Sequence, residues 1–416
     1  MKNISLFSLC LYLITITPMA HATITDQDFE SLRTDLLSLL ARVKALEKEN
    51  LVLRIQKVKN SKPFEQTRMQ VSETLPSKEA VKWKGDLSYR YEGIQVEGTD
   101  DRSRNRIRAR IALQAKLKNN VEVGFRLASG GDNPVSTNQS LGDGGSSKDI
   151  KLDLAYFNWK TNHSVNLIAG KFKNIWARPD NNELIWDSDY NPEGFALTYK
   201  HKNLFLNSAL NWLQSDSKKK NTRFSWGIQG GVNTQLAGAK LKTGISYYNL
   251  SVKDRGVFIG DNDEFAGNSF TCVDPTNLID CTYDNDYEVL EVLAEFKTEL
   301  NGLPVIVFGD YLQNIAADNL DTAWAAGIKL GKASGRGSWD LAYRYQSIEA
   351  DSLLGLTTNS DFAGGGTDGK GHIFRGSFAI NNQWKLRFTY FNNKRNGDLG
   401  QEEDYDRIQI DTRLSF

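Results

Sequence analysis

Four arginines at alternate positions are the residues of this chain whose type and spacing could do chemistry. They are Arg104, Arg106, Arg108 and Arg110. Residues two apart on a β-strand point to the same face, so four guanidinium groups would stack along about 20 Å of one wall. An arginine facing lipid at the membrane midplane costs roughly 2–4 kcal/mol. The row is therefore expected to face water, where it would attract anions.

The elements that must carry this row are short segments of alternating polarity, sixteen in all, between Trp83 and Phe416. In the last of them, Ile408 and Ile410 share one face and Arg407 and Gln409 the other. Tight polar turns alternate with long loops rich in Gly, Asp and Asn, which is typical of outer-membrane barrels and not of a soluble β-sandwich. We therefore expect an all-β fold, a 16-stranded antiparallel transmembrane β-barrel over 83–416, in the outer membrane of a Gram-negative bacterium.

Further charged residues fall on the inward faces of these strands. Because strand sixteen closes beside strand one, arginines of the first three and last four strands would form one basic sector, with acids of the tenth and eleventh strands opposite, among them Asp310. The predicted pore-lining residues are Arg90, Arg104, Arg106, Arg108, Arg110, Arg126, Glu291, Glu295, Arg344, Arg375, Arg387, Arg407 and Arg413. Pairing of the arginines with Glu92, Glu122 or Asp86, which would only brace the wall, is an alternative that does not exclude the first.

The long loop 172–193 carries acids and aromatic residues in one stretch. If it folds into the barrel, its acids would meet the arginines and form a constriction; the alternative is an outward loop that closes the rim. The predicted constriction residues are Asp180, Glu183, Asp187 and Asp189.

The first 82 residues read as three segments that precede the barrel. Lys2, an apolar run over 4–17 and the sequence Ala-His-Ala before residue 23 predict a signal peptide over 1–22. Leucine and other residues spaced three and four apart over 29–57 predict a coiled-coil helix within 23–57, although a single amphipathic helix would show the same pattern. Two prolines then mark 58–82 as a linker.

Cysteine and histidine content limits other chemistry. Cys10 would leave with the signal peptide, and the remaining Cys272 and Cys281 are expected to form a disulfide within one long loop after export. Four histidines, none near this pair, argue against a metal site, and no cofactor is expected.

No serine–histidine or carboxylate–histidine set repeats, so we expect no enzyme activity. A net charge of zero argues against a nucleic-acid partner.

Several of these runs also carry a family resemblance. They are RNRIRARIALQAKL at 104–117, VEVGFRLASG at 121–130, DNPVSTNQSLGDG at 132–144, DLAYFNW at 153–159 and ELIWDSDYNPEGFAL at 183–197. Together they resemble the putative porin family of Gram-negative bacteria. The resemblance implies an outer-membrane channel, typically trimeric, and supplies no ligand. It does not extend to the long loop with the two cysteines.

Two functions follow from these patterns as expectations. The first is an outer-membrane porin for passive, charge-selective diffusion of small hydrophilic solutes, with an arginine-lined lumen that favours anions. The alternative is an anchor or spacer whose coiled coil tethers or organises the envelope. The expected partners are outer-membrane lipid, further copies of the chain as a trimer, and small hydrophilic solutes or anions.

Overall fold

The computed structural model describes residues 81–416, apart from 162–163, 216–217, 219, 261–263 and 275–279. The chain divides into one unit over 1–75 and a second over 76–416. Of the first unit only Ser38, Ala41, Arg42 and Ala45 are described, each as a helical residue. The predicted signal peptide, the coiled-coil seam and nearly all of the linker lie outside the described residues, as does the tethering role that depends on them. Among the described residues no helix is long and apolar enough to cross a membrane.

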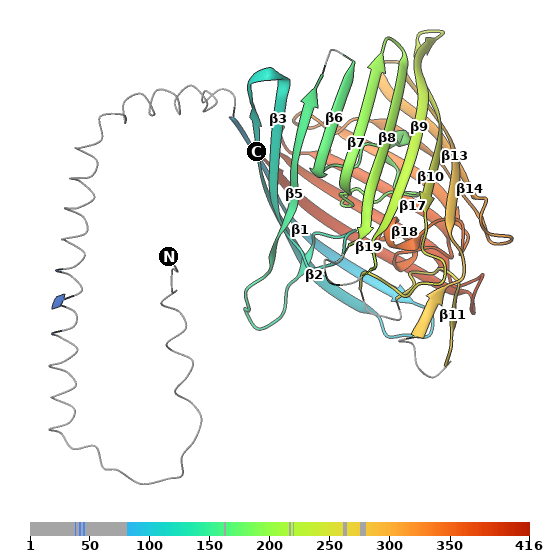
Figure 1. Ribbon diagram of the computed structural model, residues 1–416. Helices are drawn as coiled ribbons and strands as arrows, with labels where there is room; N and C mark the ends of the chain where they lie inside the picture. Colours follow the sequence, from blue (N-terminus) through green and yellow to red (C-terminus); the bar gives the residue numbers. More distant parts are fainter. Residues whose placement is uncertain are drawn as a thin grey trace. The chain divides into compact units, whose positions relative to one another are not determined.

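The described part of the second unit is a closed antiparallel barrel of sixteen strands (Figure 1). Closure is made by β1, which pairs with β2 on one side and with β19 on the other. This confirms the predicted barrel, which begins at Val81. The barrel strands are β1 (Val81–Val96), β2 (Arg102–Lys116), β3 (Val121–Ser129), β5 (Ile150–Lys160), β6 (Val165–Lys171), β7 (Glu193–His201), β8 (Leu204–Gln214), β9 (Arg223–Leu236), β10 (Ala239–Leu250), β13 (Tyr287–Leu300), β14 (Leu303–Asn314), β15 (Thr322–Gly331), β16 (Trp339–Ile348), β17 (Gly369–Ala379), β18 (Trp384–Arg395) and β19 (Glu403–Ser415).

The two faces of the wall differ in the way that period-two alternation requires. On β19, the outward Ile408 and Ile410 are 41% and 50% exposed, whereas the inward Arg407 and Gln409 are each 2% exposed. Apolar side chains that remain uncovered on the outside suit a lipid surround. Charged side chains on the inside avoid the cost of facing hydrocarbon.

Connections at one end of the barrel are tight, and those at the other end are long. The turn between β13 and β14 consists of Asn301 and Gly302, both with positive φ (51° and 79°), which is the backbone of a type I′ hairpin turn. The long connections hold three further short strands, β4 (Gln139–Ser140), β11 (Phe270–Cys272) and β12 (Cys281–Tyr283). Cys272 and Cys281 face each other across the β11–β12 hairpin and are joined by a disulfide.

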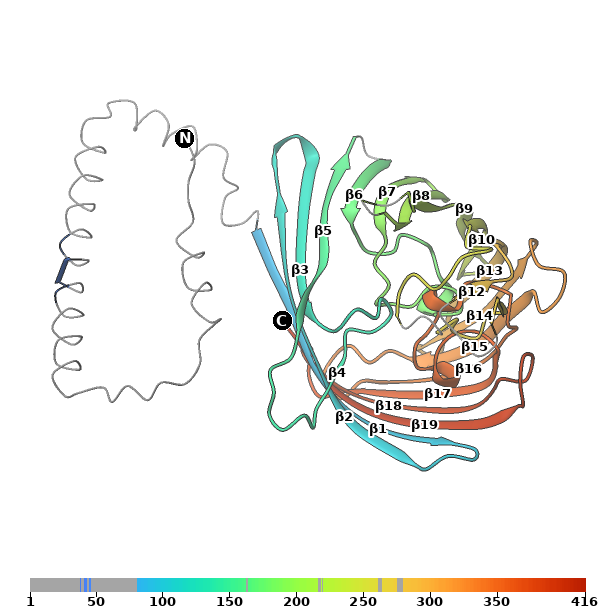
Figure 2. The same cartoon turned by 60° about the horizontal axis from the view of Figure 1, so that its bottom comes forward.

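Described residues of three long loops pack into the barrel and contribute to a hydrophobic core there (Figure 2). They are loop 172–192, loop 251–286 and loop 349–368. Asn268 ties two of them together, because its amide donates to the carbonyls of Ala350 (2.7 Å) and Leu353 (2.8 Å) and accepts from the N–H of Gly355 (2.8 Å). The core includes Phe172, Trp176, Leu184, Ile185, Trp186, Tyr248, Leu250, Val252, Phe265, Tyr283, Leu353, Leu354, Phe362 and Phe391. An apolar core inside the barrel differs from the polar lumen that strand alternation alone predicts, because apolar loop residues pack against apolar inward residues of the strands.

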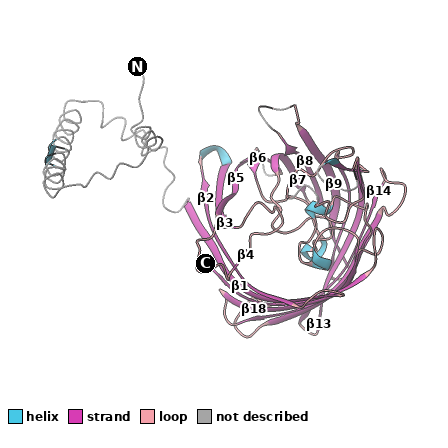
Figure 3. Ribbon diagram, turned by 90° about the horizontal axis from the view of Figure 1, so that it is seen from below, coloured by secondary structure: helices cyan, strands magenta, loops and turns pink. Residues whose placement is uncertain are grey.

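Wall side chains hold the backbone of loop 172–192. Gln229 of β9 accepts a hydrogen bond from the N–H of Ala177 (2.7 Å) and donates one to its carbonyl (3.0 Å), as a neighbouring strand would. Gln229 is fully buried and also donates to Ser246 (3.0 Å). Seen along the barrel, the loops crowd the side of β7 to β9 and β14 (Figure 3).

Two inward carboxylates hold the same loop farther along. Glu295 of β13 accepts a hydrogen bond from the N–H of Asp180 (2.6 Å), and Asp310 of β14 accepts one from the side chain of Asn182 (2.7 Å). Glu291 accepts from the hydroxyl of Tyr248 (2.9 Å). The three carboxylates are 1–4% exposed. They therefore lie beneath the loop, which differs from the open acidic wall predicted from the sequence, because a loop distant in the chain covers them.

The bonds from Gln229 to Ala177 give a first prediction. Gln229→Ala removes both and leaves buried backbone groups of the loop unpaired, a loss of about 1–3 kcal/mol of local stability. We expect trypsin to cleave after Lys173 or Arg178 about tenfold faster in the folded, detergent-solubilised variant than in the unchanged protein. Gln235→Ala, at an exposed position of the same strand, is the matched control. Equal cleavage rates in both variants would contradict the anchoring role.

Candidate functional site

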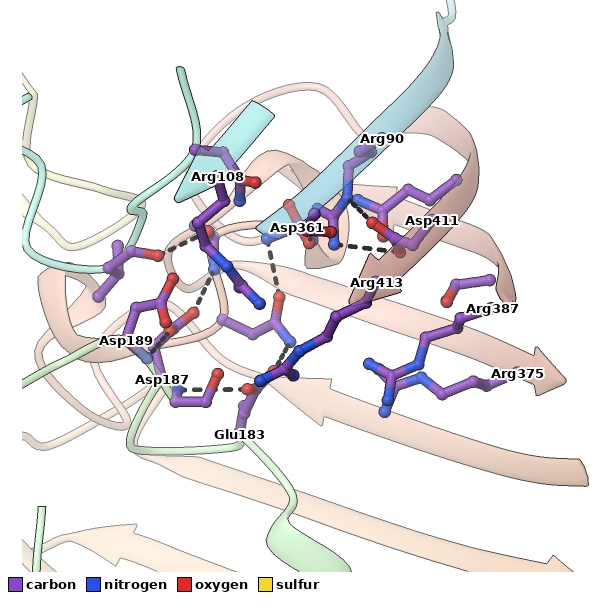
Figure 4. A pocket seen from close by; sticks show the side chains of 18 of the residues that line it. Arg90, Arg108, Glu183, Asp187, Asp189, Asp361, Arg375, Arg387, Asp411 and Arg413 are labelled. Carbon is purple, nitrogen blue, oxygen red and sulfur yellow. Dashed lines mark hydrogen bonds and ion pairs between the residues drawn. The ribbon is translucent and has the colours of Figure 1, made fainter. Parts of the chain in front are cut away.

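The cavity of interest lies between the inward loops and the wall made by β1, β2 and β17 to β19. It measures about 250 Å³. Loop 172–192 and loop 349–368 form its second side (Figure 4). Eight basic and five acidic side chains line it among the described residues. The basic ones are Arg90, Arg108, Arg110, Lys173, Arg375, Lys385, Arg387 and Arg413, and the acidic ones are Glu183, Asp187, Asp189, Asp361 and Asp411.

The four arginines of β2 point inward, and each has a carboxylate partner on β1. Arg108 and Arg110 lie 3.2 Å and 2.9 Å from the carboxylate oxygens of Asp86. Arg104 and Arg106 lie 3.4 Å and 3.3 Å from those of Glu92. Strand register causes the pairing, because Asp86 is directly opposite Arg110 and Glu92 directly opposite Arg104. Ion pairs across the two strands thus brace this part of the wall.

Arg90 and Arg407 share one carboxylate, that of Asp361, and the spacing of residues along the strands does not predict this contact. Arg90 is bound by Asp411 (2.7 Å) and by Asp361 (2.8 Å), and Arg407 by Asp361 (2.7 Å) and by Glu92. Asp361 belongs to loop 349–368. Burial by itself raises the pKa of Asp361, but Arg407 and Arg90 outweigh it and hold that pKa well below its usual range. Asp361 is therefore ionised and joins the loop to the barrel wall.

The remaining predicted arginines differ in their pairing. Arg126 is paired with Asp153, and Arg413 lies 3.4 Å from Asp86. Arg344, Arg375 and Arg387 make no ion pair within the described part of the chain. Arg375 and Arg387 line the cavity.

The predicted constriction residues all lie inside the barrel, on loop 172–192. Asp189 binds Arg110 (3.1 Å) and accepts a hydrogen bond from the hydroxyl of Thr137 (3.0 Å), so this loop reaches the arginine row. Asp180 lies near Lys329 (3.4 Å). Glu183 accepts hydrogen bonds from the backbone N–H of Ser188 (3.2 Å) and from the side chain of Asn359.

Asp187 is the least exposed to lumen water of the cavity acids. Its two oxygens accept hydrogen bonds from the backbone N–H groups of Asp189 (2.6 Å) and Ser360 (3.2 Å). Burial, together with the negative charges of Glu183 and Asp189, raises the pKa of Asp187 well above its usual range. The acid side of the cavity therefore carries less negative charge than its residue types suggest.

Sequence patterns missed Asp361 and Asn359, because both belong to an irregular loop far from the arginines in the chain. Asp411 was visible only as a polar position on an inward face, whereas the predicted pairing of arginines with Asp86 and Glu92 is confirmed. His372 lies outside the cavity and contacts the hydroxyl of Tyr343 through its Nδ1 (2.9 Å). Among the described residues no group of three His, Cys, Asp or Glu could hold a metal ion.

Comparison with solved structures supports the fold. The structure of OprB from Pseudomonas putida matches with a TM-score of 0.57 and 13% identity, over 85% of this chain and 97% of that chain. A loop-deletion mutant of OmpT from Vibrio cholerae gives 0.48 and 11% identity, over 81% of this chain and 100% of that chain. A mutant of Rh. blastica porin gives 0.47 and 12% identity with the same coverage. At these identities the first match shows a shared fold and nothing further.

Comparison by sequence identifies the family. No curated protein matches this chain. The family model described as "Putative porin" matches residues 61–255 and 279–416, which is most of the chain. Family and fold both point to a channel rather than an enzyme. The protein therefore belongs to this porin family and is a porin of the outer membrane of a Gram-negative bacterium.

Proposed function

We propose that this porin lets small hydrophilic solutes diffuse passively through the cavity beside β17 to β19 and that it favours anions. One observation carries the proposal: basic side chains outnumber acidic ones in the lining, eight to five, and Arg375 and Arg387 have no ion pair among the described residues. An excess of one charge in a narrow, low-dielectric passage raises the local concentration of ions of opposite sign.

Pairing divides the arginines into two groups with different effects on the field. Asp86 and Glu92 are each shared by more than one arginine, so they compensate only part of the positive charge of the arginines that they hold. The unpaired ones keep their full charge. Protonation of Asp187 would increase the imbalance further. Passage would depend on weak interaction at several positions, so that solutes can also leave.

The proposal is tested by the reversal potential of the purified protein in a planar bilayer across a potassium chloride gradient. We expect a potential of the sign given by chloride permeating faster than potassium. The preference for chloride over potassium should weaken at high salt, because the Debye length falls to about 3 Å at 1 M. A potential near zero or of the opposite sign would overturn the anion preference and leave a general porin.

Lys173 makes the preference depend on pH. Crowding by protein atoms, followed by the charges of Arg126 and Arg110, lowers the pKa of Lys173 to about 8, although the side chain remains exposed to lumen water. Lys173 is thus charged below this pH and neutral above it. We expect the anion preference to fall between pH 7 and pH 9, and Lys173→Gln to make that fall smaller. The same pH dependence in both proteins would contradict the assignment.

We also propose that the porin assembles as a trimer, supported by its family and by the heptad spacing over 29–57. Light scattering that separates protein from detergent should give the mass of three copies. A mass of one copy would contradict the proposal. A chain lacking 23–57 then tests the heptads: loss of the trimer would assign assembly to them, and an unchanged mass would assign it to the barrel wall.

A further inference from the structure

In the described part of the barrel, Arg375 of β17 and Arg387 of β18 lack the carboxylate partners that the other arginines lining the cavity have. Arg90, Arg108 and Arg110 each lie within 3.2 Å of a carboxylate oxygen. Arg375 and Arg387 have no carboxylate within 4.0 Å among the described residues. Both face the same cavity as the paired arginines. The pattern therefore concentrates uncompensated positive charge on one patch of the lining.

Two carboxylates near this patch, Asp411 and Asp86, already bind other arginines. Asp411 is directly opposite Arg387 across β18 and β19, yet Arg90 binds both of its oxygens (2.7 Å and 3.3 Å). Asp86, the carboxylate nearest Arg413, also binds two arginines of β2. The acids on the loop side, such as Asp187, are engaged by backbone N–H groups. Asp340 of β16, which is opposite Ser377 and accepts a hydrogen bond from the N–H of Ala333 (3.0 Å), also makes no ion pair with Arg375 or Arg387 within the described part of the chain.

Strand register brings the two unpaired arginines together. Arg375 is opposite Thr389 and Arg387 is opposite Ser377, so the two arginines are diagonal neighbours on one face of adjacent strands. Such neighbours are about 7–8 Å apart, and like charges at this spacing repel. The two side chains lie next to each other and extend toward the space that Arg413 also enters (Figure 4). A bound anion between them would relieve the repulsion.

The same patch offers the donors that an oxyanion needs. Each guanidinium presents a planar fork of N–H groups that matches two oxygens of an anion. Ser377 and Thr389 line the cavity beside the arginines and add hydroxyl donors. Lys385, which is opposite Arg413, adds a further cation. A cavity of about 250 Å³ is large enough for a small oxyanion that keeps part of its hydration.

We propose that Arg375 and Arg387, with Ser377 and Thr389, form a discrete binding subsite for small oxyanions that carry two negative charges. The subsite rests on the proposed anion passage and goes beyond it. A diffuse positive potential attracts anions in proportion to their concentration, whereas a discrete subsite saturates. An oxyanion held there would also slow the movement of chloride past it.

The test measures chloride current through the porin in a planar bilayer while sulfate, a dianion throughout the working pH range, is added to both sides. We expect the current to fall and level off at millimolar sulfate. The double variant R375Q/R387Q should raise the half-blocking sulfate concentration about tenfold, because two charge-assisted contacts are lost. The control K116Q/K240Q removes two lumen charges away from the cavity and should leave that concentration unchanged within a factor of two.

The outcomes separate this subsite from the proposed function. If the unchanged porin prefers chloride over potassium but sulfate does not block in a saturable way, the subsite is wrong and the anion passage stands. If R375Q/R387Q and K116Q/K240Q shift the block equally, a diffuse field explains it and the subsite is also wrong. A porin without anion preference overturns the passage itself. Succinate in the same assay shows which shape of dianion the subsite prefers. Tighter block by sulfate would indicate a compact oxyanion, and tighter block by succinate would indicate a dicarboxylate. Either result supports the subsite.

Two further variants guard against failure of the double variant to fold. R387Q changes an exposed side chain and should raise the half-blocking concentration by itself. R375K/R387K keeps both charges but loses the planar forks, so it should retain the anion preference while binding sulfate more weakly than the unchanged protein. Block as tight as in the unchanged protein would show that charge without fork geometry is sufficient, and would overturn the subsite as described.

Discussion

Loop 172–192 depends on a few buried hydrogen bonds from the barrel wall, and the interior depends on that loop. Gln229 binds the backbone of Ala177 in both directions, and Glu295 and Asp310 bind the loop farther along. A polar backbone placed in the middle of a barrel costs several kcal/mol unless such partners satisfy it. With these bonds in place, Trp176 and Trp186 can pack against Tyr248 and begin the apolar core.

That core determines how much free space is left inside the barrel. Loops 251–286 and 349–368 complete it and are bound to each other through Asn268. The side of the barrel that they fill is closed by packed apolar groups. The charged cavity lies against β17 to β19 and the first two strands. The position of this cavity therefore follows from the folding of the loops, and its charged lining from the strand and loop residues that face it.

The arginines of this wall serve two different purposes. Those of β2 pair with Asp86 and Glu92 across a single strand boundary and stiffen the wall, as ion-pair networks commonly do. Arg375 and Arg387 make no ion pair within the described part of the chain, and Asp411, which is opposite Arg387, binds Arg90 instead. One residue type thus stabilises the wall at one place and lines the cavity without an ion pair at another. Which role an arginine has is set by its neighbours and not by its own strand.

The sequence by itself determined the barrel, the strand faces and the inward direction of the arginine row. Period-two alternation is a local property, and lipid on one side makes an error of one residue costly. It could not determine that Glu291, Glu295 and Asp310 lie under a loop, since the loop that covers them is more than a hundred residues away in the chain. The pairing of Arg90 with Asp361 spans 271 residues. Only the tertiary structure decided which charges are compensated, because ion pairing and burial depend on distances in space, and irregular loops carry no period from which those distances can be predicted.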